Sequence, residues 1–353
     1  MESYKIQQFL EGKTIFITGA TGFLAKILVE KILRVQPNVK KLYLLLRASD
    51  TKSAKKRFHE EVMQIELFKV LREKIGAKNL NSLVEEKVFP VAGDISYEDF
   101  GIENSEIKDE MFKEIDIIIN SAATTRFDER YDIAMNINVL GAVNVLMFAK
   151  RCEKVKIIVH VSTAYVCGEG EGVIPEKSFI LGETLNKNSY LDIDMERKVI
   201  EDKLKELEAQ NFTSKEVTIA MKDLGIQRTV DSFILGYGKG ILNFCFGDPN
   251  TKIDAIPGDM VVNSILAAII AHGNQYYSSQ ESIYHISSSK KNPLKSCDIQ
   301  LFLFHYFTKN PWINKDGNII KVGMPPLFSS MDSFQKYIST YYWPLLKVFF
   351  SSI

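Results

Sequence analysis

Short apolar runs alternate with longer, more polar stretches through the first half of the chain. The apolar runs have the length of strands, and they are continuous rather than alternating. Continuous runs rich in leucine and β-branched residues are typical of strands buried on both faces of a parallel sheet. The expected strands are 14–17, 41–47, 87–94, 116–120 and 155–162.

In the longer stretches, apolar residues recur every three or four positions or charged residues dominate, as in surface helices. These stretches lie from Gly22 to about 33 and at 52–74, 132–150, 183–225 and 260–272, with a short late strand at 282–286 and a mainly helical remainder. The alternation of strands and helices predicts an α/β fold, a Rossmann-type doubly wound parallel sheet. The charged segment 183–225 is most simply a helical cap over the open end of that sheet.

The segment Thr18–Ala25, with the sequence TGATGFLA, joins the first expected strand to the first expected helix. Strand, glycine turn and helix form the setting of a loop that binds the phosphates of a dinucleotide. Gly19 would allow the tight turn, Gly22 the approach of the backbone to the pyrophosphate, and Ala25 the packing of helix on strand. The helix N-terminus would then face the phosphates. The segment therefore predicts binding of a dinucleotide cofactor.

Two charged residues stand after the second and third expected strands. Arg47 lies where a dinucleotide fold contacts the adenosine ribose, and an arginine there suits the 2′-phosphate of NADP. Asp94 lies where it could hold the adenine amino group. The alternatives are a surface arginine and an aspartate of an ordinary turn. The pattern favours NADPH as the cofactor.

Small and hydroxyl residues follow the fourth and fifth expected strands. The segment Ser121–Thr124 (SAAT) would let the backbone pass close to the cofactor. The hydroxyl of Thr163, or next that of Ser162, is placed to hydrogen-bond a carbonyl beside the nicotinamide. A strand-end hydroxyl that bonds its own backbone is the alternative. We expect Tyr165 to be a packing residue, and His160 a hydrogen-bonded core histidine rather than a catalyst.

Composition and charge restrict the partners. The 353 residues are enough for two domains, 46% of them are hydrophobic, and 44 basic residues balance 44 acidic ones. A nucleic-acid partner would usually bring a basic excess, so none is expected. The four cysteines lie far apart, without the spacing of a metal site or a disulfide framework. This predicts no metal and a reducing compartment.

Two features bear on localisation. The first expected strand begins near Thr14, which leaves no room for a signal or transit peptide, and no apolar run looks long enough to span a bilayer. We therefore expect an intracellular protein, either cytoplasmic or peripheral at the endoplasmic reticulum. The segment 341–350 (YYWPLLKVFF) could lie at a membrane interface, although a buried amphipathic segment is the simpler alternative.

Taken in order, these motifs resemble the extended short-chain dehydrogenase/reductase group, and within it the plant alcohol-forming fatty acyl-CoA reductases of the male-sterility type. The resemblance covers nearly the whole chain. The matching segments are 18–25, 44–47 (LLLR), 93–95 (GDI), 120–128 (NSAATTRFD), 161–166 (VSTAYV), 221–225 (MKDLG), 236–240 (GYGKG) and 309–317 (KNPWINKDG). Chance does not produce that set in that order.

The resemblance implies a reaction and a set of contacts. Members of this family reduce a long-chain acyl-CoA with NADPH to an aldehyde and then to a primary fatty alcohol, releasing CoA. The cofactor would contact Gly19, Thr21, Gly22, Phe23, Leu24, Arg47, Asp94, Ile95, Ala122, Ala123 and Thr124. The catalytic set would join a hydroxyl, here Thr163 or Ser162, to a Tyr that donates a proton and a Lys that lowers the pKa of that Tyr.

The chain departs from this family twice. None of its fourteen tyrosines has a lysine four residues later, so the helix with Tyr-x-x-x-Lys and the strand after it are missing, at a join between Arg228 and Thr229. The family's C-terminal domain is only begun where the chain stops at Ile353. We predict a Rossmann domain at 1–272 with a deletion near 228/229, and a truncated C-terminal domain at 281–353. General acid catalysis is typically worth about 10²–10⁴-fold, so we expect weak or no activity.

Two alternatives stay open. The chain could be a non-catalytic protein that binds the cofactor or an acyl chain, or that dimerises with itself or with an intact relative. Loss of an internal strand favours association with another protein, because it leaves apolar faces of neighbouring elements uncovered. The chain could also be a reductase or epimerase for another small substrate, although that chemistry needs a proton donor too.

Overall fold

The computed structural model describes residues 8–126, 129–163, 173–178, 180, 182–183, 192–226, 245–246, 248–273, 281–311, 313, 317–324 and 326–341. The chain divides into two units that interleave along the sequence, Met1–Thr229 with Pro257–His285, and Val230–Ile256 with Ile286–Ile353. The domains expected at 1–272 and 281–353 stay a prediction.

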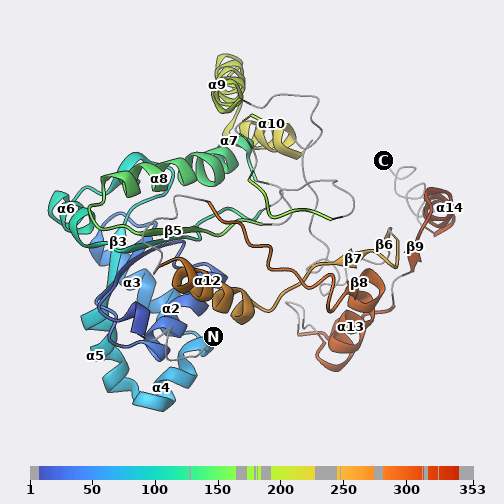
Figure 1. Cartoon of the computed structure of the whole chain (residues 1–353). Coiled ribbons are helices and arrows are strands. Elements are labelled where there is room, and N and C mark those ends of the chain that lie inside the picture. The colour runs from blue at the N-terminus through green and yellow to red at the C-terminus, as the bar shows by residue number, and fades with distance from the viewer. Residues whose placement is uncertain are drawn as a thin grey trace. The chain divides into compact units, whose positions relative to one another are not determined.

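A five-stranded parallel sheet forms the centre of the first unit (Figure 1). Its strands are β1 (Thr14–Thr18), β2 (Lys41–Leu46), β3 (Val88–Ala92), β4 (Ile117–Asn120) and β5 (Ile157–His160). Their order is β3-β2-β1-β4-β5, the Rossmann order, which confirms the predicted fold class. The expected strands match to within a few residues, because buried strands in parallel sheets are continuous apolar runs.

One face of the sheet packs against α2 (Phe23–Val35), α3 (Thr51–Phe58) and α12 (Gly258–Gly273) (Figure 1). Ile15, Ile17 and Leu44 point into this layer, together with Leu28 and Ile32 of α2. All of them are buried. The helix expected from Gly22 to about 33 and the one expected at 260–272 therefore both cover this face.

The stretch expected as one helix at 52–74 is instead broken into pieces. They are α3, η1 (His59–Met63), η2 (Glu66–Phe68) and α4 (Lys69–Ile75), followed by α5 (Ala77–Lys87), which the sequence pattern did not reveal. The break lies at Ile65, whose backbone is extended (φ −73°, ψ 158°). The bend lets Val62 and Phe68 reach the same core cluster, which a straight helix would not allow.

The opposite face packs against α6 (Ser105–Glu114) and α8 (Gly141–Arg151). Phe16 of β1 lies between Phe100, from the 3-10 turn η3 (Glu98–Gly101), and Phe148 of α8, with ring centroids 5.3 and 5.6 Å away. Ile118 and Met111 complete this apolar layer. The sheet thus has helices on both faces, as the fold class requires, although β5 at its edge is partly exposed.

The helix expected at 132–150 is a continuous helical stretch made of α7 (Tyr131–Ala134), the π-helix η4 (Met135–Leu140) and α8. By length and composition alone, Tyr131–Arg151 could cross a membrane, so the expectation that no run was long enough is wrong. Asn138 and Asn144 interrupt the apolar run in the sequence and conceal its length. Phe148 is buried against the sheet, whereas Leu146 and Met147 of the same helix are exposed.

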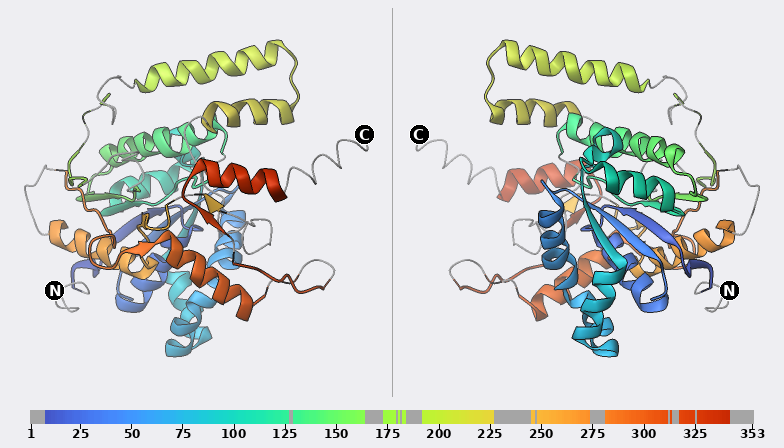
Figure 2. Two further views of the ribbon diagram at one scale, coloured as in Figure 1. Left: turned by 90° about the vertical axis from the view of Figure 1, so that its right-hand side faces the viewer. Right: turned by 90° about the vertical axis from the view of Figure 1, so that its left-hand side faces the viewer.

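Two charged helices, α9 (Ile193–Ala209) and α10 (Ser214–Ile226), occupy the segment expected to be helical and lie beyond α8 and α7 (Figures 1 and 2). That they cap the open end of the sheet stays a prediction. The Asp192 side chain caps α9 by accepting from the Asp194 and Met195 amides at 2.8 and 3.1 Å. Ile200 and Leu207 pack with Met135 in a small separate cluster.

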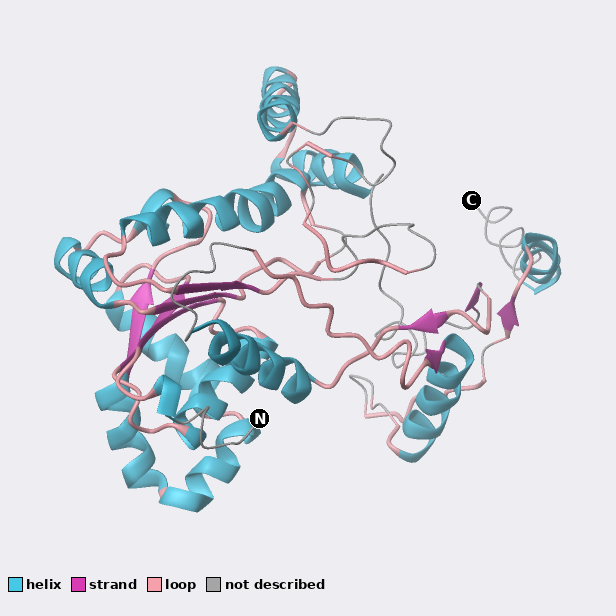
Figure 3. Cartoon of the chain, in the orientation of Figure 1, coloured by secondary structure: helices cyan, strands magenta, loops and turns pink. Residues whose placement is uncertain are grey.

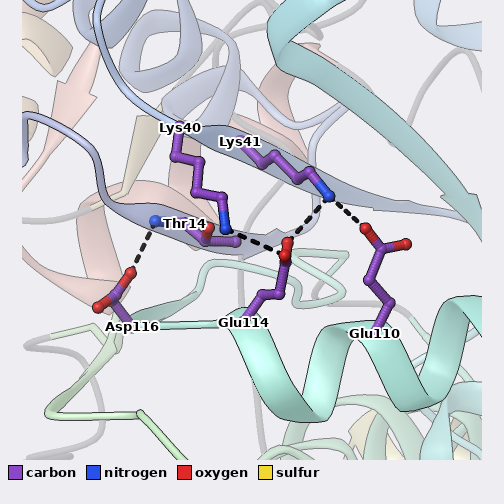
Figure 4. Close-up of polar contacts among 6 residues, drawn as sticks. All are labelled: Thr14, Lys40, Lys41, Glu110, Glu114 and Asp116. Atoms are coloured by element: carbon purple, nitrogen blue, oxygen red, sulfur yellow. Dashed lines mark hydrogen bonds and ion pairs between the residues drawn. The ribbon is translucent and has the colours of Figure 1, made fainter.

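Charged side chains join α6 to the amino end of β2, and Asp116, which follows α6, contacts the amino end of β1 (Figure 4). Lys41 pairs with Glu110 and, at 2.9 Å, with Glu114, while Asp116 accepts from the Thr14 amide at 2.9 Å. Burial alone would lower the pKa of Lys41, but the hydrogen bonds to these two carboxylates raise it above its ordinary value. This network lies at the edge of the sheet opposite the carboxyl ends of the strands.

The second unit is described only in part. Its elements are β6 (Cys245–Phe246), β7 (Lys252–Ile253), β8 (Leu294–Lys295), α13 (Ser296–Lys309), β9 (Leu327–Phe328) and α14 (Met331–Tyr341) (Figure 3). The short strands pair as β6 with β9 and β7 with β8. Its longest elements are the helices α13 and α14, which hold fewer than half of its described residues.

The strand expected at 282–286 is wrong, since these residues form no strand. The His285 amide donates to the Glu176 carboxylate at 2.7 Å instead of to a neighbouring strand. A partner so distant in sequence leaves no sign in the local pattern.

Candidate functional site

The predicted cofactor and catalytic residues all follow the carboxyl ends of the five parallel strands. The loop with Gly19 and Gly22 follows β1, Arg47 follows β2, and Asp94 follows β3. The segments Ser121–Thr124 and Ser162–Thr163 follow β4 and β5. The strand order reverses between β1 and β4, and ligands of open α/β sheets bind at such a point.

The glycine turn after β1 has the geometry that the sequence predicted. Gly19 has φ +69°, which L-residues rarely adopt, and the Gly22 amide donates to the Gly19 carbonyl at 2.8 Å. A Cβ added to Gly19 would lie 2.8 Å from backbone atoms of Ser121 and Ala122. The loops after β1 and β4 are therefore in contact, and a side chain at Gly19 would force them apart.

Helix α2 begins directly after this turn. Gly22 is its N-cap and no side chain caps its first amides, while Ala25 is buried against the core, as predicted. Uncapped amides at a helix N-terminus suit an anionic group such as a phosphate. Phe23 is exposed, whereas Thr21 and Leu24 are half-buried.

Arg47 is exposed at the end of β2, and its carbonyl accepts from the Arg57 guanidinium. Arg57 also donates to both carboxylate oxygens of Glu61, at 2.6 and 2.9 Å. These hydrogen bonds lower the pKa of Glu61, with smaller contributions from the charges of Lys26 and Arg47. Arg47 and Lys26 therefore bring positive charge to the ends of β2 and of the glycine loop.

Asp94 lies in a tight turn after β3, where its Oδ1 accepts from the amide and hydroxyl of Ser96 at 2.9 and 2.8 Å. The Asp94 amide donates to the carbonyl of Phe100 at 2.8 Å. Phe100 has φ +60°, a strained conformation for a bulky residue, and its ring is fully buried. Ile95 is a core residue whose carbonyl accepts from Asn144 at 2.9 Å.

The helix η4 holds the loop after β4. Asn138 accepts from the Thr124 amide at 2.9 Å and donates to the Thr124 carbonyl at 3.1 Å. Ala122 is half-buried and Ala123 is exposed beside it. The roles of Asn138 and Asn144 were not predicted from the sequence, although an asparagine inside an otherwise apolar helix is a sign of such a role.

A chain of hydrogen bonds crosses the carboxyl ends of three strands. The Thr18 hydroxyl donates to Asn120 Oδ1 at 2.6 Å, and Asn120 Nδ2 lies 2.9 Å from His160 Nδ1. Asn120 is only 2% exposed. His160 has the hydrogen bond that we expected but, as a residue, it is exposed on β5 rather than in the core.

Ser162 and Thr163 are exposed after the last residue of β5. The hydrogen bond expected from one of these hydroxyls to a carbonyl beside the nicotinamide stays a prediction. Tyr165, the join at 228/229, Trp312 and the segment 342–350 lie outside the described residues. Among the described residues, no group of three or more His, Cys, Asp or Glu side chains could hold a metal ion.

The residues present fit a dinucleotide. The left-handed Gly19, the uncapped start of α2 and the charge of Arg47 lie at the same edge of the sheet. A bound nicotinamide cofactor would supply hydride there. The protein would contribute amides for the pyrophosphate and a cation for the adenosine end.

The comparisons with known proteins agree with this geometry. Residues 17–218 match the model of the male sterility protein family of NAD-binding domains. The chain is 44% identical to a probable fatty acyl-CoA reductase 5 of Arabidopsis thaliana, over 95% of this chain and 78% of that protein. It is 43% identical to an alcohol-forming fatty acyl-CoA reductase of Simmondsia chinensis, over 98% of this chain and 81% of that protein.

A solved structure shares the fold at low identity. The reductase domain of a nonribosomal peptide synthetase from Mycobacterium tuberculosis has a TM-score of 0.58 and 16% identity, covering 96% of this chain and 80% of that chain. This likeness supports the Rossmann-type fold alone.

Each alignment has more positions than the number of residues that this chain contributes to it. The one with the Arabidopsis protein spans 390 positions, whereas 95% of 353 residues is about 335, so about 55 positions hold no residue of this chain. The one with the Simmondsia protein spans 401 positions, against about 346 residues for 98% of the chain, which again leaves about 55.

The family match covers more than half of the chain, and these relatives exceed 40% identity over nearly all of it. Together with the Rossmann sheet and its glycine turn, they show that this chain belongs to the plant fatty acyl-CoA reductase family.

Proposed function

We propose that this chain binds NADPH and long-chain acyl-CoA as a fatty acyl-CoA reductase by descent, and that its own reduction of acyl-CoA to fatty alcohol is weak or absent. The observation that carries the first part is the glycine turn against the loop after β4, at the start of α2. The substrate is that of its named relatives.

The choice of NADPH rests on Arg47. Its position after β2 corresponds to the adenosine ribose of a bound dinucleotide, and the exposed guanidinium can form two hydrogen bonds to a phosphate. An acid, which would favour the ribose hydroxyls of NADH, is absent from this position.

The weak activity rests on the missing proton donor. No tyrosine in the sequence has a lysine four residues later, and about 55 aligned positions of the relatives have no residue here. Without a general acid near the carbonyl, the developing alkoxide would have to take its proton from water. That loss is typically worth about 10²–10⁴-fold in rate.

The exposed apolar surface on β5 and α8 supports the same conclusion. Ile158 lies in register with Ile118 and on the same face, yet it is 41% exposed. On α8, Val143, Leu146 and Met147 are also exposed. A right-handed crossover from β5 to a further strand would place its helix on this face, beside α8. The uncovered residues lie where a lost helix would pack.

The first experiment follows the melting temperature of the purified 353-residue chain as NADPH is added. A ligand that binds only the folded state raises this temperature with concentration, so an upward shift supports cofactor binding. A cooperative transition that does not move at saturating NADPH would contradict it. NADH at the same concentrations is the control for the 2′-phosphate.

The second experiment inserts the corresponding segment of the Arabidopsis relative between Arg228 and Thr229. Fatty alcohol formed from a long-chain acyl-CoA is then measured by mass spectrometry. We expect the insertion to raise the rate by at least about 100-fold over the natural chain. A version whose inserted Tyr and Lys are replaced by Phe and Met is the matched control. Strong fatty alcohol formation by the natural chain would refute the proposed weak activity.

A second function is favoured by the same uncovered surface. A non-catalytic protein could associate with an intact relative through the apolar residues of β5 and α8. Co-purification of the two proteins tests it, and an absence of association at micromolar concentrations would rule it out.

A further inference from the structure

The hydrogen bonds across the carboxyl ends of β1, β4 and β5 have only one consistent set of donors and acceptors. The Thr18 oxygen accepts from the amides of Ser121 and Ala122, both at 3.1 Å. A hydroxyl has one proton and two acceptor positions, so these amides leave Thr18 with its proton to donate. That proton goes to Asn120 Oδ1 at 2.6 Å.

This arrangement determines the state of the next two groups. With its oxygen facing Thr18, Asn120 turns its NH₂ group towards His160, where Nδ2 and Nδ1 are 2.9 Å apart. His160 Nδ1 must then be an acceptor without a proton. The neutral ring therefore has its proton on Nε2. In a ring protonated on both nitrogens, the Nδ1–H donor would face the NH₂ donor of Asn120, and the hydrogen bond would be lost.

The last residues of the three strands are in register, which is why they can meet. Thr18 pairs with Asn120, and Asn120 pairs with His160. Residues in register on neighbouring parallel strands share a face, so the three side chains lie in one row. Thr18 is fully buried and Asn120 nearly so, which makes an unsatisfied group there costly.

We propose that His160 is a positioning residue for the candidate cofactor site, acting through Asn120 and Thr18 on the loop after β4. Its Nδ1 keeps the Asn120 carboxamide in the orientation that the Thr18 hydroxyl needs. Thr18 in turn holds the two amides of the loop that packs on Gly19. The role in cofactor binding rests on the proposed function, whereas the effect on the loop does not.

The test compares His160→Leu with His160→Asn in the full-length chain. Asparagine places its Oδ1 where the ring has Nδ1, so it keeps the acceptor, whereas leucine removes it. His305→Leu on α13, where the histidine is exposed, is the control for loss of an imidazole elsewhere. Hydrogen exchange of the Ser121 and Ala122 amides is measured without cofactor, and NADPH affinity is then determined.

We expect His160→Leu to speed exchange of these two amides about tenfold and to weaken NADPH binding by a similar factor, as for loss of one hydrogen bond to the buried Asn120 side chain. His160→Asn and His305→Leu should stay within about twofold of the natural chain. Unchanged exchange in His160→Leu, or equal loosening in His160→Asn, would overturn the proposal.

The exchange measurement separates this proposal from the proposed function. If the natural chain does not bind NADPH, the proposed function fails, but the exchange of the two amides still decides the role of His160. If His160→Leu does not fold, nitrogen NMR of ¹⁵N-histidine in the natural chain takes its place, with His160→Asn to assign the signal. A neutral His160 with its proton on Nδ1 would then overturn the proposal.

Discussion

At the scale of single residues, the environment of a side chain decides its role more than its type does. Gly12 and Gly19 have nearly the same left-handed backbone, with φ +66° and +69°. An added Cβ would meet nothing within 4 Å at Gly12, but the backbone of the loop after β4 at Gly19. A substitution at Gly12 therefore tests the cost of the left-handed backbone alone, whereas one at Gly19 adds the steric clash with the loop after β4.

We predict that Gly19→Ala lowers the free energy of unfolding by about 3 kcal/mol and abolishes the NADPH-dependent shift of the melting temperature. Gly12→Ala, the matched control, should cost only about 1–2 kcal/mol for the backbone conformation and keep the shift. Chemical denaturation measures both costs. Equal losses in the two variants would show that the loop after β4 moves aside easily.

Arg47→Ala should weaken NADPH binding by about 10–100-fold and leave NADH binding nearly unchanged, because only the 2′-phosphate loses its charged partner. Fluorescence titration with each cofactor measures the two affinities. A parallel loss for both cofactors would mean that Arg47 acts on the fold and not on the phosphate.

The titration of His160 gives a pH dependence of stability. Partial burial lowers the pKa of His160 below its ordinary value of 6.5, so the unfolded chain binds this proton more readily than the folded one. The contribution of neutral His160 is fully present above pH 6.5 and is lost as the pH falls through the lowered folded pKa. His160→Asn should remove this part of the pH dependence, as measured by urea unfolding between pH 5 and 8. An unchanged slope in the variant would contradict the assignment.

At the scale of elements, the strands were easier to predict than the helices and the contacts between them. All five strands of the sheet were found from their apolar runs. Strands β1, β2 and β4 are buried almost throughout, and a strand buried on both faces is apolar along its whole length. The bend at Ile65 and the helix α5 were not predicted, because tertiary packing determines them. The strand predicted at 282–286 does not form, since the His285 amide bonds a distant carboxylate instead. The residues that hold the loops, Asn138 and Asn144, lie 14 and 49 positions from the groups that they bind.

Helix α8 has one buried side and one exposed apolar side. We predict that Phe148→Ala lowers the free energy of unfolding by about 3–5 kcal/mol, because its ring packs between Phe16, Phe100 and Phe112. Met147→Ala, the neighbour on the same helix, should change it by no more than about 0.5 kcal/mol, since Met147 is 51% exposed. Denaturant unfolding of both variants measures the contrast, and similar values would mean that something covers Met147 in solution.

At the scale of the whole molecule, the chain keeps the sheet of its family but exposes apolar residues at one end of it. Exposed apolar patches of this kind favour association. If the chain associates with an intact relative through α8, Leu146→Lys with Met147→Lys should weaken that association at least tenfold without loss of the fold. Sedimentation of the mixed proteins measures it, and Lys69→Glu on the far helix α4 is a surface control. Association unaffected by the double change would exclude this surface.

The sequence by itself determined the fold class, the position of the cofactor loop and the family, because strands, glycine turns and motif order are written in neighbouring residues. It also shows that no tyrosine has a lysine four residues later, which is the basis for the proposed loss of the proton donor. Only the tertiary structure decided that Gly19 packs on the loop after β4, that His160 bonds Asn120, and that Ile158 is left uncovered. The groups that meet in the first two contacts are 40 residues or more apart, and chain folding alone brings them together.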